Sequence, residues 1–226
     1  MTQCLPLGRL RLALHTLRAP APGHTSGPLL LLHGLGECSP SQVPEDYHRW
    51  PGPVHALDFA GHGQSSTPVG GGYTCEALMV QVVTALDAVG PCTLVGRGLG
   101  AYVALLATAA RATQVRGTVL RDGPGLAGGG DGTQSPYLPA VAASALDTPD
   151  PHALADLLTD VRHPAAAARW AQLVRNASPW QTPVHFCLRE RPAWALVAAG
   201  ALAQAFTPVS LALADCALLH TEPCTP

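Results

Sequence analysis

Polar side chains that can bind ligands or move protons follow several short apolar segments of this sequence. They are Glu37, Cys38, His62, Arg97, Asp122 and His220. If the apolar segments are parallel strands, these side chains gather at the carboxyl end of the sheet, where α/β proteins bind their ligands. An imidazole and a carboxylate within hydrogen-bond reach of one another could act there on water or on a substrate proton. His220 and Asp122 are the candidates for that role.

The elements that must position these side chains alternate between strand and helix. Short apolar runs predict strands, and apolar residues at helical spacing predict helices between them. The predicted strands are 10–15 (an edge or hairpin strand), 29–32, 54–59, 92–95, 117–120, 184–188 and 209–214. The predicted helices are 74–89, 101–112, one from 150, one from 164 and 193–203. Alternation of this kind is typical of parallel β-α units, in which the sheet is covered on both faces.

The alternation breaks at the glycine-rich stretch GPGLAGGGDGTQSPYLP, which two helix-like segments follow. The first of them begins at Asp150-Pro151, because aspartate and proline make a good helix start. We therefore expect a single domain whose core comprises residues 1–122 and 181–226. A helical cap at 123–180 is inserted between the sixth and seventh strands of the implied sheet.

Three motifs make the chain similar to the α/β-hydrolase superfamily over nearly its whole length. HGLGE, residues 33–37, resembles the loop after the third strand that contributes a backbone N–H to the oxyanion hole. DFAGHGQSS, residues 58–66, resembles the D-x-x-G-x-G-x-S segment after the fourth strand. LVGRGLGAYVALL, residues 94–106, is similar to the strand–turn–helix of the nucleophile elbow. The resemblance implies a three-layer α/β-hydrolase fold, with a mostly parallel central sheet, helices on both faces and a small helical cap.

The elbow holds Gly98 where a hydrolase of this superfamily carries its serine. Without an Oγ atom there is no nucleophile, so the resemblance implies that the acyl-enzyme reaction is not available. The N–H groups of the oxyanion site should remain and point into a pocket above Gly98. The residues expected to form this ligand site are Gly34, Leu35, Gly36, Arg97 and Leu99. Of these, Arg97 forms either a salt bridge or a contact to an anionic ligand.

Glycine patterns like that of the elbow also occur in dinucleotide-binding loops. GRGLG differs from G-x-G-x-x-G, and it follows the fifth strand instead of the first. The nearest acidic residue after a following strand is in Arg121-Asp122, not at the expected distance of about 20 positions. We therefore expect no nucleotide and no other cofactor.

The sequence does not decide which residues take the acid and histidine positions of a Ser-His-acid triad. The family acid usually follows the seventh strand, where LRERPAW would leave Glu190 to serve from a shifted position. Asp122, after the sixth strand, is either an alternative acid or a turn-forming residue. The family histidine follows the eighth strand, so Ala217 or, with one gap, His220 takes its position. Loss of three members together favours a protein that no longer uses the triad. We expect His62 to stabilise its loop.

Composition and charge limit the partners. The formal net charge of −2 and the pI near 6.5 leave no basic field for nucleic acid or anionic lipid. The seven cysteines form no C-x-x-C pair, which predicts reduced thiols and no metal site. The N-terminus lacks a secretion signal, and the longest apolar run, 193–206, is too short to span a bilayer. We expect a cytoplasmic protein with a small-molecule ligand and with neither a nucleic-acid nor a membrane partner.

Three functions are compatible with the sequence. The first is a non-hydrolytic member of the superfamily that binds a small, mostly apolar carbonyl or ester-like compound under the cap. The second is an enzyme of hydrolase, lyase or cyclase type that uses the oxyanion site with His220 or Asp122. The third is an oligomeric scaffold, because the family's closing helix has no predicted counterpart and a second copy of the chain could cover that face.

Overall fold

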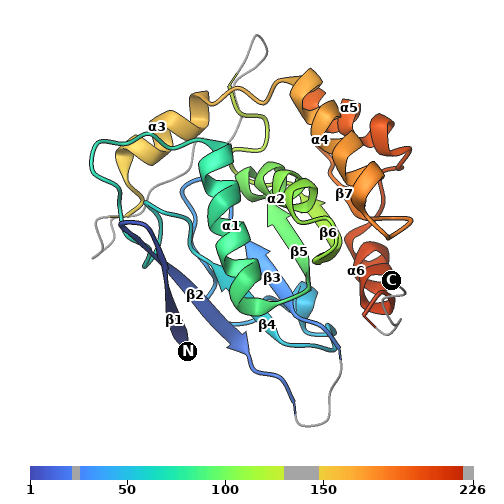
Figure 1. Ribbon diagram of the computed structural model, residues 1–226, viewed down its shortest axis with the longest axis horizontal. Helices are drawn as coiled ribbons and strands as arrows, with labels where there is room; N and C mark the ends of the chain where they lie inside the picture. The colour runs from blue at the N-terminus through green and yellow to red at the C-terminus, as the bar shows by residue number, and fades with distance from the viewer. Residues whose placement is uncertain (22–25, 130–147, 221–226) are drawn as a thin grey trace.

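The computed structural model describes residues 1–21, 26–129 and 148–220, and its centre is a twisted sheet (Figure 1). Within these residues the sheet has seven strands in the order β1-β2-β4-β3-β5-β6-β7. They are β1 (Thr2–Leu7), β2 (Leu10–Arg18), β3 (Leu29–Leu32), β4 (Val54–Leu57), β5 (Cys92–Arg97), β6 (Val115–Arg121) and β7 (Val184–Cys187). β2 pairs antiparallel with β1 and β4, and the other neighbours are parallel. The predicted mostly parallel sheet is confirmed.

The inner strand β3 consists of four leucines, all of them buried. Because strand side chains alternate between the two faces of a sheet, a continuous apolar run needs cover on both faces. Leu30 and Leu32 belong to the larger hydrophobic cluster, whereas Leu29 and Leu31 belong to a second cluster on the opposite face. The strand predicted at 29–32 is confirmed.

In the described part of the chain, four helices pack against the face that carries the larger cluster. They are α1 (Cys75–Val89), α2 (Leu99–Ala110), α4 (Pro164–Ala177) and α5 (Ala193–Leu202). Figure 1 shows α1 and α2 in front of the strands. Thr74 caps α1 by accepting the N–H of Ala77 at 3.1 Å, which satisfies a donor that has no partner within the helix. All four helices lie where the sequence predicts helices.

The prediction of a strand at 209–214 is wrong. These residues begin the helix α6 (Val209–Leu218), which starts directly after Pro208. Ala212 and Cys216, four residues apart, are buried on the face of the sheet opposite to α1 and α2, where α6 contacts β6 and β7. A short apolar run fits a buried helix as well as a strand, and here the helix fits the spacing of the buried residues. α6 therefore covers part of the sheet face opposite to α1 and α2.

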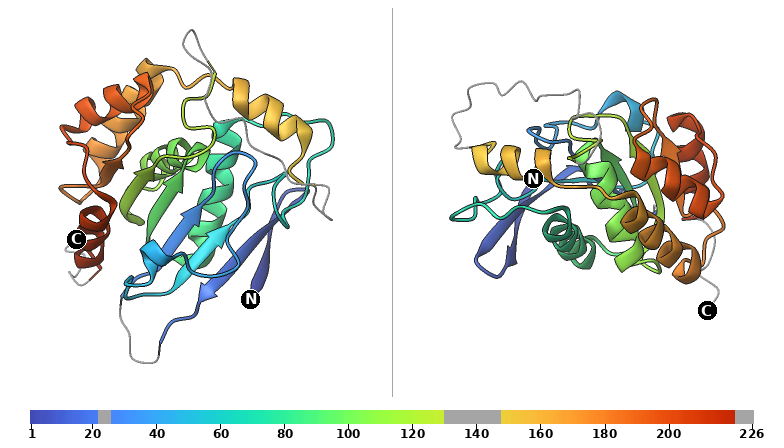
Figure 2. Two further views of the ribbon diagram at one scale, coloured as in Figure 1. Left: turned by 180° about the vertical axis from the view of Figure 1, so that it is seen from behind. Right: turned by 90° about the horizontal axis from the view of Figure 1, so that it is seen from above.

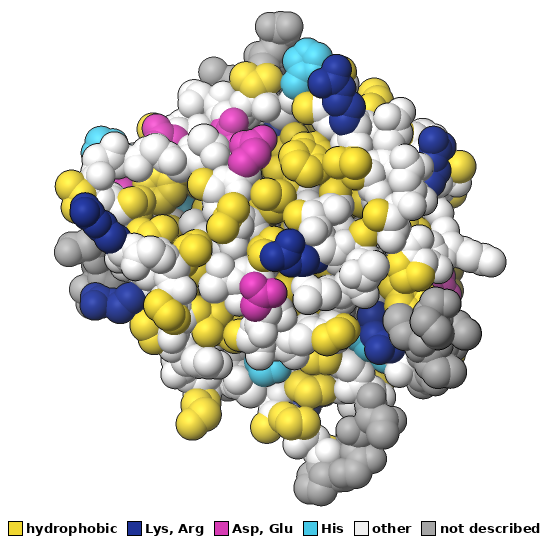
Figure 3. Space-filling model, in the orientation of Figure 1, with side chains coloured by type: hydrophobic (Ala, Val, Ile, Leu, Met, Phe, Trp, Pro, Cys, Tyr) yellow, Lys and Arg dark blue, Asp and Glu magenta, His cyan; other side chains and the backbone are white. Residues whose placement is uncertain are grey.

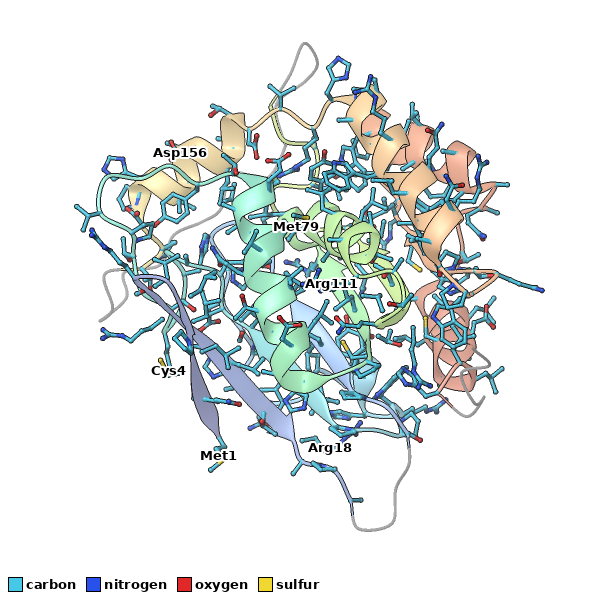
Figure 4. All side chains as sticks on the ribbon, viewed as in Figure 1. Met1, Cys4, Arg18, Met79, Arg111 and Asp156 are labelled. Atoms are coloured by element: carbon cyan, nitrogen blue, oxygen red, sulfur yellow. The ribbon has the colours of Figure 1, made fainter. Side chains whose placement is uncertain are left out.

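The insertion between β6 and β7 contains α3 (Pro151–Thr159) and α4, while residues 130–147 of the predicted cap lie outside the described residues. α4 packs against α2 and α5, inside the helical layer. α3 lies at the edge of that layer (Figures 1 and 2), and its Ala153 and Leu157 are buried in the larger hydrophobic cluster. Its Asp156 carboxylate accepts the N–H groups of Gly72 at 2.9 Å and Tyr73 at 3.1 Å (Figure 4). The described insertion thus extends the helical layer and braces the segment that leads into α1.

Over α1 and α4, apolar side chains reach the surface between charged ones (Figure 3). Val80 on α1 and Leu173 on α4 are among the exposed large apolar residues. Of the helices in the described residues, none combines the length and the apolar character needed to cross a membrane.

Candidate functional site

β5 runs into α2 through a tight turn at Gly98. This residue has φ 59° and ψ −119°, a backbone conformation that residues with a side chain rarely adopt. A Cβ on Gly96 would lie 2.6 Å from the carbonyl carbon of Gly100, and a Cβ on Gly100 would lie 2.6 Å from the carbonyl oxygen of Leu32. The flanking glycines therefore let strand and helix approach closely, as expected for an elbow.

A backbone carbonyl occupies the position expected to bind an oxyanion. The oxygen of Pro124 accepts the N–H of Leu35 at 3.0 Å and the N–H of Leu99 at 2.8 Å. These are two of the donors expected to point into an open pocket. That expectation is wrong, because both donors are satisfied by the loop that follows β6.

The two glycines of the expected site, Gly34 and Gly36, also donate within the chain. The N–H of Gly36 donates to Nε2 of His62 at 3.2 Å, and the N–H of Gly34 donates to Oε2 of Glu37 at 3.0 Å. Oε1 of Glu37 forms an ion pair with Arg97. Arg97 thus forms the salt bridge that was one of its two expected roles.

The loop after β6 presses directly onto the elbow. A Cβ on Gly98 would lie 2.6 Å from the carbonyl carbon of Gly123, and it would overlap the oxygen of Pro124. The buried Arg162 donates to the carbonyl oxygen of Gly125 and so holds the next residue of the loop. The expected pocket above Gly98 is filled by residues 123–125.

Two buried histidines near the elbow bind backbone groups. Nδ1 of His33 bonds to the oxygen of Gly34 at 2.7 Å, and its Nε2 accepts the N–H of Phe59 at 3.0 Å. Nδ1 of His62 bonds to the oxygen of Ala60 at 3.2 Å, while its Nε2 accepts from the loop after β3. Each ring is therefore a neutral imidazole with its proton on Nδ1. Burial lowers the pKa of both, that of His62 to about 3. The arrangement fits the loop-stabilising role expected for His62.

The carboxylate of Asp58 organises the loop after β4. It accepts the N–H groups of Ser39 at 2.7 Å and Gln64 at 2.8 Å, and it bonds to Nε2 of His15 at 2.8 Å. Burial alone would raise the pKa of Asp58, but the two N–H donors and the nearby histidines outweigh it and lower that pKa. In this structure the aspartate of the D-x-x-G-x-G-x-S motif therefore fixes the backbone of the loops after β3 and β4 by hydrogen bonds.

Asp122 lies at the carboxyl end of β6 and ties down the loop after β7. Its two oxygens accept the N–H of Arg189 at 3.0 and 2.9 Å, and Oδ1 also accepts the N–H of Glu190 at 3.0 Å. The two candidate acids, Asp122 and Glu190, are thus brought together. Asp122 acts there as an acceptor for backbone donors.

His220 lies near the opposite end of the sheet from Gly98. Its Nε2 is 2.9 Å from Oγ1 of Thr93, and its ring meets Trp50 edge-on at 5.6 Å between centroids. Thr93 precedes Gly98 by five residues of strand, which span about 16 Å at about 3.3 Å per residue. Burial lowers the pKa of His220 to about 4. The structure therefore separates His220 from Asp122, so these two candidates do not form a pair of imidazole and carboxylate.

The position after β7 that an eighth strand would occupy is taken by a single residue. Phe206 forms an isolated parallel bridge with Phe186 of β7, and Thr207 and Pro208 follow it. Ala217, the other candidate for the histidine position, lies within α6. The sequence placed the eighth strand at residues that form α6, so the position expected for the histidine does not follow a strand in this structure.

Two cavities open at the carboxyl ends of the strands, and Arg97 and Arg121 line both. The first, here called the Tyr47 cavity, has a volume of about 420 Å³. The second, here called the Arg191 cavity, has a volume of about 690 Å³ and lies between the ends of β6 and β7 and the start of α6. Neither cavity is lined by Gly98, by α3 or by α4.

The residues of these cavities that sequence reasoning missed include Tyr47, Arg121, Arg189, Arg191 and Phe206. Arg121 could have been found, because it ends a strand as Arg97 does. Tyr47 lies in a three-residue 3-10 helix within an irregular loop, and no periodicity marks it.

The fold and the elbow define a protein of the α/β-hydrolase type. The sequence matches the Alpha/beta hydrolase family over residues 29–224, and the chain belongs to this family. A candidate lipase (lip1) from Acinetobacter baumannii AYE is similar in structure, with a TM-score of 0.59 and 15% identity over 89% of this chain and 78% of that one.

The thioesterase domain from the curacin biosynthetic pathway gives a TM-score of 0.58 and 18% identity, over 98% of this chain and 97% of that domain. At such identities the likeness shows the fold alone. Several other hydrolase structures are matched over about half of their length. Comparison with curated protein sequences gives no match.

Proposed function

We propose that this member of the Alpha/beta hydrolase family binds a small, mostly apolar carbonyl compound without hydrolysing it. The observation that carries the proposal is the Pro124 carbonyl, which accepts the N–H groups of Leu35 and Leu99 directly above Gly98. An oxyanion site stabilises a reaction only when its donors are free to bind the oxygen of the substrate. Here those donors bind the chain itself, and the residue below them has no nucleophilic atom.

The placement of the histidines supports the same conclusion. His33 and His62 use both ring nitrogens on nearby groups of the chain, and their lowered pKa values keep them neutral. His220 lies near the other end of β5. None of these three imidazoles is placed to take a proton at the elbow.

The Tyr47 cavity supports the choice of ligand. Leu31, Leu32 and Val95 supply apolar walls. The hydroxyl of Tyr47 accepts a hydrogen bond from Arg121 at 2.5 Å, so its own proton remains to donate to a ligand. Burial raises the pKa of Tyr47 although Arg121 opposes the shift, and the phenol stays protonated at neutral pH. The ion pairs Arg97–Glu37 and Arg121–Asp46 also line this cavity. Apolar walls beside an oriented O–H donor suit a ketone or an ester carbonyl.

Acetophenone and phenyl acetate test the proposal as a matched ketone and ester. We expect wild-type protein to bind acetophenone and to leave phenyl acetate intact over hours. Tyr47→Phe should weaken acetophenone binding by about 2- to 10-fold, since one neutral hydrogen bond is lost. Tyr73→Phe is the matched control, because the Tyr73 hydroxyl donates to Asp150 and lies outside this cavity. Hydrolysis of phenyl acetate, or equal effects of the two substitutions on binding, would contradict the proposal.

Gly98→Ser tests the absence of catalysis directly. We expect this variant to react neither with esters nor with a fluorophosphonate probe, because no base reaches the new hydroxyl and the loop covers it. Circular dichroism establishes that the variant is folded before the assay. A labelled serine in a folded variant would mean that the loop moves away and that a base lies within reach.

A further inference from the structure

The Arg191 cavity has walls of opposite character. Apolar side chains of Leu188, Phe206 and Val209 form one part of its lining. Four arginines, residues 97, 121, 189 and 191, and two carboxylates, residues 122 and 190, form the charged part. The charged part of the lining therefore offers both cationic and anionic groups, and the ion pairs decide which of them are free.

Arg189 and Arg191 are the two arginines of this lining that are not engaged in an ion pair with another described residue. Arg97 pairs with Glu37, and Arg121 pairs with Asp46 at 2.8 Å; both of these carboxylates line the Tyr47 cavity. Among the described residues, the ion pairs include neither Arg189 nor Arg191. The carboxylate of Asp122 is already engaged by two backbone N–H groups.

Arg191 is held in place by an aromatic ring. Its guanidinium carbon lies 4.3 Å from the centroid of Phe206, and Phe206 packs in turn on Phe186 at 5.8 Å between centroids. A guanidinium that lies over an aromatic face keeps its N–H donors free at its edge. That arrangement leaves a flat, oriented donor group at the wall of the cavity.

Two helices that begin beside the cavity contribute positive potential at their amino ends. α5 starts after Pro192 and α6 after Pro208, and neither helix has a side-chain cap. Because the amino end of a helix carries partial positive charge, both helices favour an anion in the same place as the arginines do.

We propose that the Arg191 cavity binds a small aromatic anion, whose carboxylate or phosphate group lies against Arg189 and Arg191 and whose ring lies beside Phe206. This site is separate from the Tyr47 cavity, and it does not depend on the state of the elbow. The proposal therefore goes beyond the proposed function, and its variants leave Tyr47 and Gly98 unchanged.

Benzoate, phenyl phosphate and the neutral analogue benzyl alcohol are the probes, each titrated into the full-length protein by calorimetry. We expect both anions to bind, benzyl alcohol to bind at least about tenfold more weakly, and the anion affinity to fall as sodium chloride is raised. Arg191→Gln and Arg189→Gln should each weaken anion binding by about tenfold, since each removes a charged hydrogen bond. Arg9→Gln is the matched control, because Arg9 is equally exposed but lies at the hairpin turn between β1 and β2.

Several results would overturn the inference. One is equal binding of benzoate and benzyl alcohol, and another is anion binding that Arg9→Gln weakens as much as Arg191→Gln does. Absence of anion binding at millimolar concentration in a folded wild-type protein would also overturn it. Loss of acetophenone binding in Tyr47→Phe with unchanged benzoate binding would show that the two cavities act independently.

Discussion

Replacement of Gly98 by alanine tests whether the Pro124 carbonyl lies on the elbow in solution. The φ of 59° disfavours a residue with a Cβ atom, at a cost of about 1–2 kcal/mol. The overlap of that Cβ with Pro124 forces the loop or the turn to shift, at a further cost of about 1–3 kcal/mol. The total loss of about 2–5 kcal/mol is large against the 5–15 kcal/mol that stabilise a typical domain. It corresponds to a fall in Tm of about 4–20 °C, at about 2–4 °C per kcal/mol.

Gly8→Ala separates the two contributions. Gly8 has φ 58°, and nothing lies within 4 Å of a Cβ added there. The control variant therefore incurs the cost of a positive φ without the overlap. Urea unfolding followed by far-UV circular dichroism measures both variants, and we expect Gly98→Ala to lose about 1–3 kcal/mol more than Gly8→Ala.

Equal losses in the two variants would refute this reasoning, because the added methyl group would then meet open space above the elbow. Hydrogen exchange of the wild-type protein gives a second readout. The N–H groups of Leu35 and Leu99 should be protected, since both donate to Pro124. Fast exchange at both positions would mean that the loop leaves the elbow.

The remaining predictions concern the loops around the elbow. Asp58→Asn removes a charge that accepts from Ser39, Gln64 and His15, so we expect urea unfolding to show a loss of about 1.5–3 kcal/mol; an unchanged midpoint would contradict this role. The pKa of His62 is lowered from 6.5 to about 3, so between these pH values the unfolded chain binds more protons than the folded one. Stability should therefore fall as the pH falls below 6.5, with His62 contributing at most about 1.4 kcal/mol per pH unit. His62→Gln should flatten the dependence of Tm on pH between 6 and 4, and an unchanged slope would argue against this group.

The parts of the fold that follow from local pattern could be predicted from the sequence. Four consecutive leucines need cover on both faces, and Thr74 before an apolar helical pattern marks a helix start. The run VSLALA was misread because it is short, so that strand and buried helix are equally compatible with it. Tertiary packing favours the helix, because Ala212 and Cys216 on one helix face pack against β6 and β7.

The candidate site was predicted only in part, because its decisive contacts are not local. The motif around Gly98 indicated the elbow, and the structure has the turn there. The carbonyl of Pro124 lies 26 positions further along the chain, and a backbone oxygen has no signature of its own in a sequence. His220 was misplaced for a related reason, since its position depended on a strand that does not form.

On the proposed function, the Pro124 carbonyl also bears on how this chain could gain hydrolytic activity by evolution. A serine at position 98 alone would meet an occupied site, and withdrawal of residues 123–125 alone would uncover a turn that has no nucleophile. A third change is needed at Thr207-Pro208, where a histidine would have to appear. Since none of these steps is advantageous by itself, we expect strong epistasis among them. Directed evolution toward esterase activity should then require all three regions to be varied in one library.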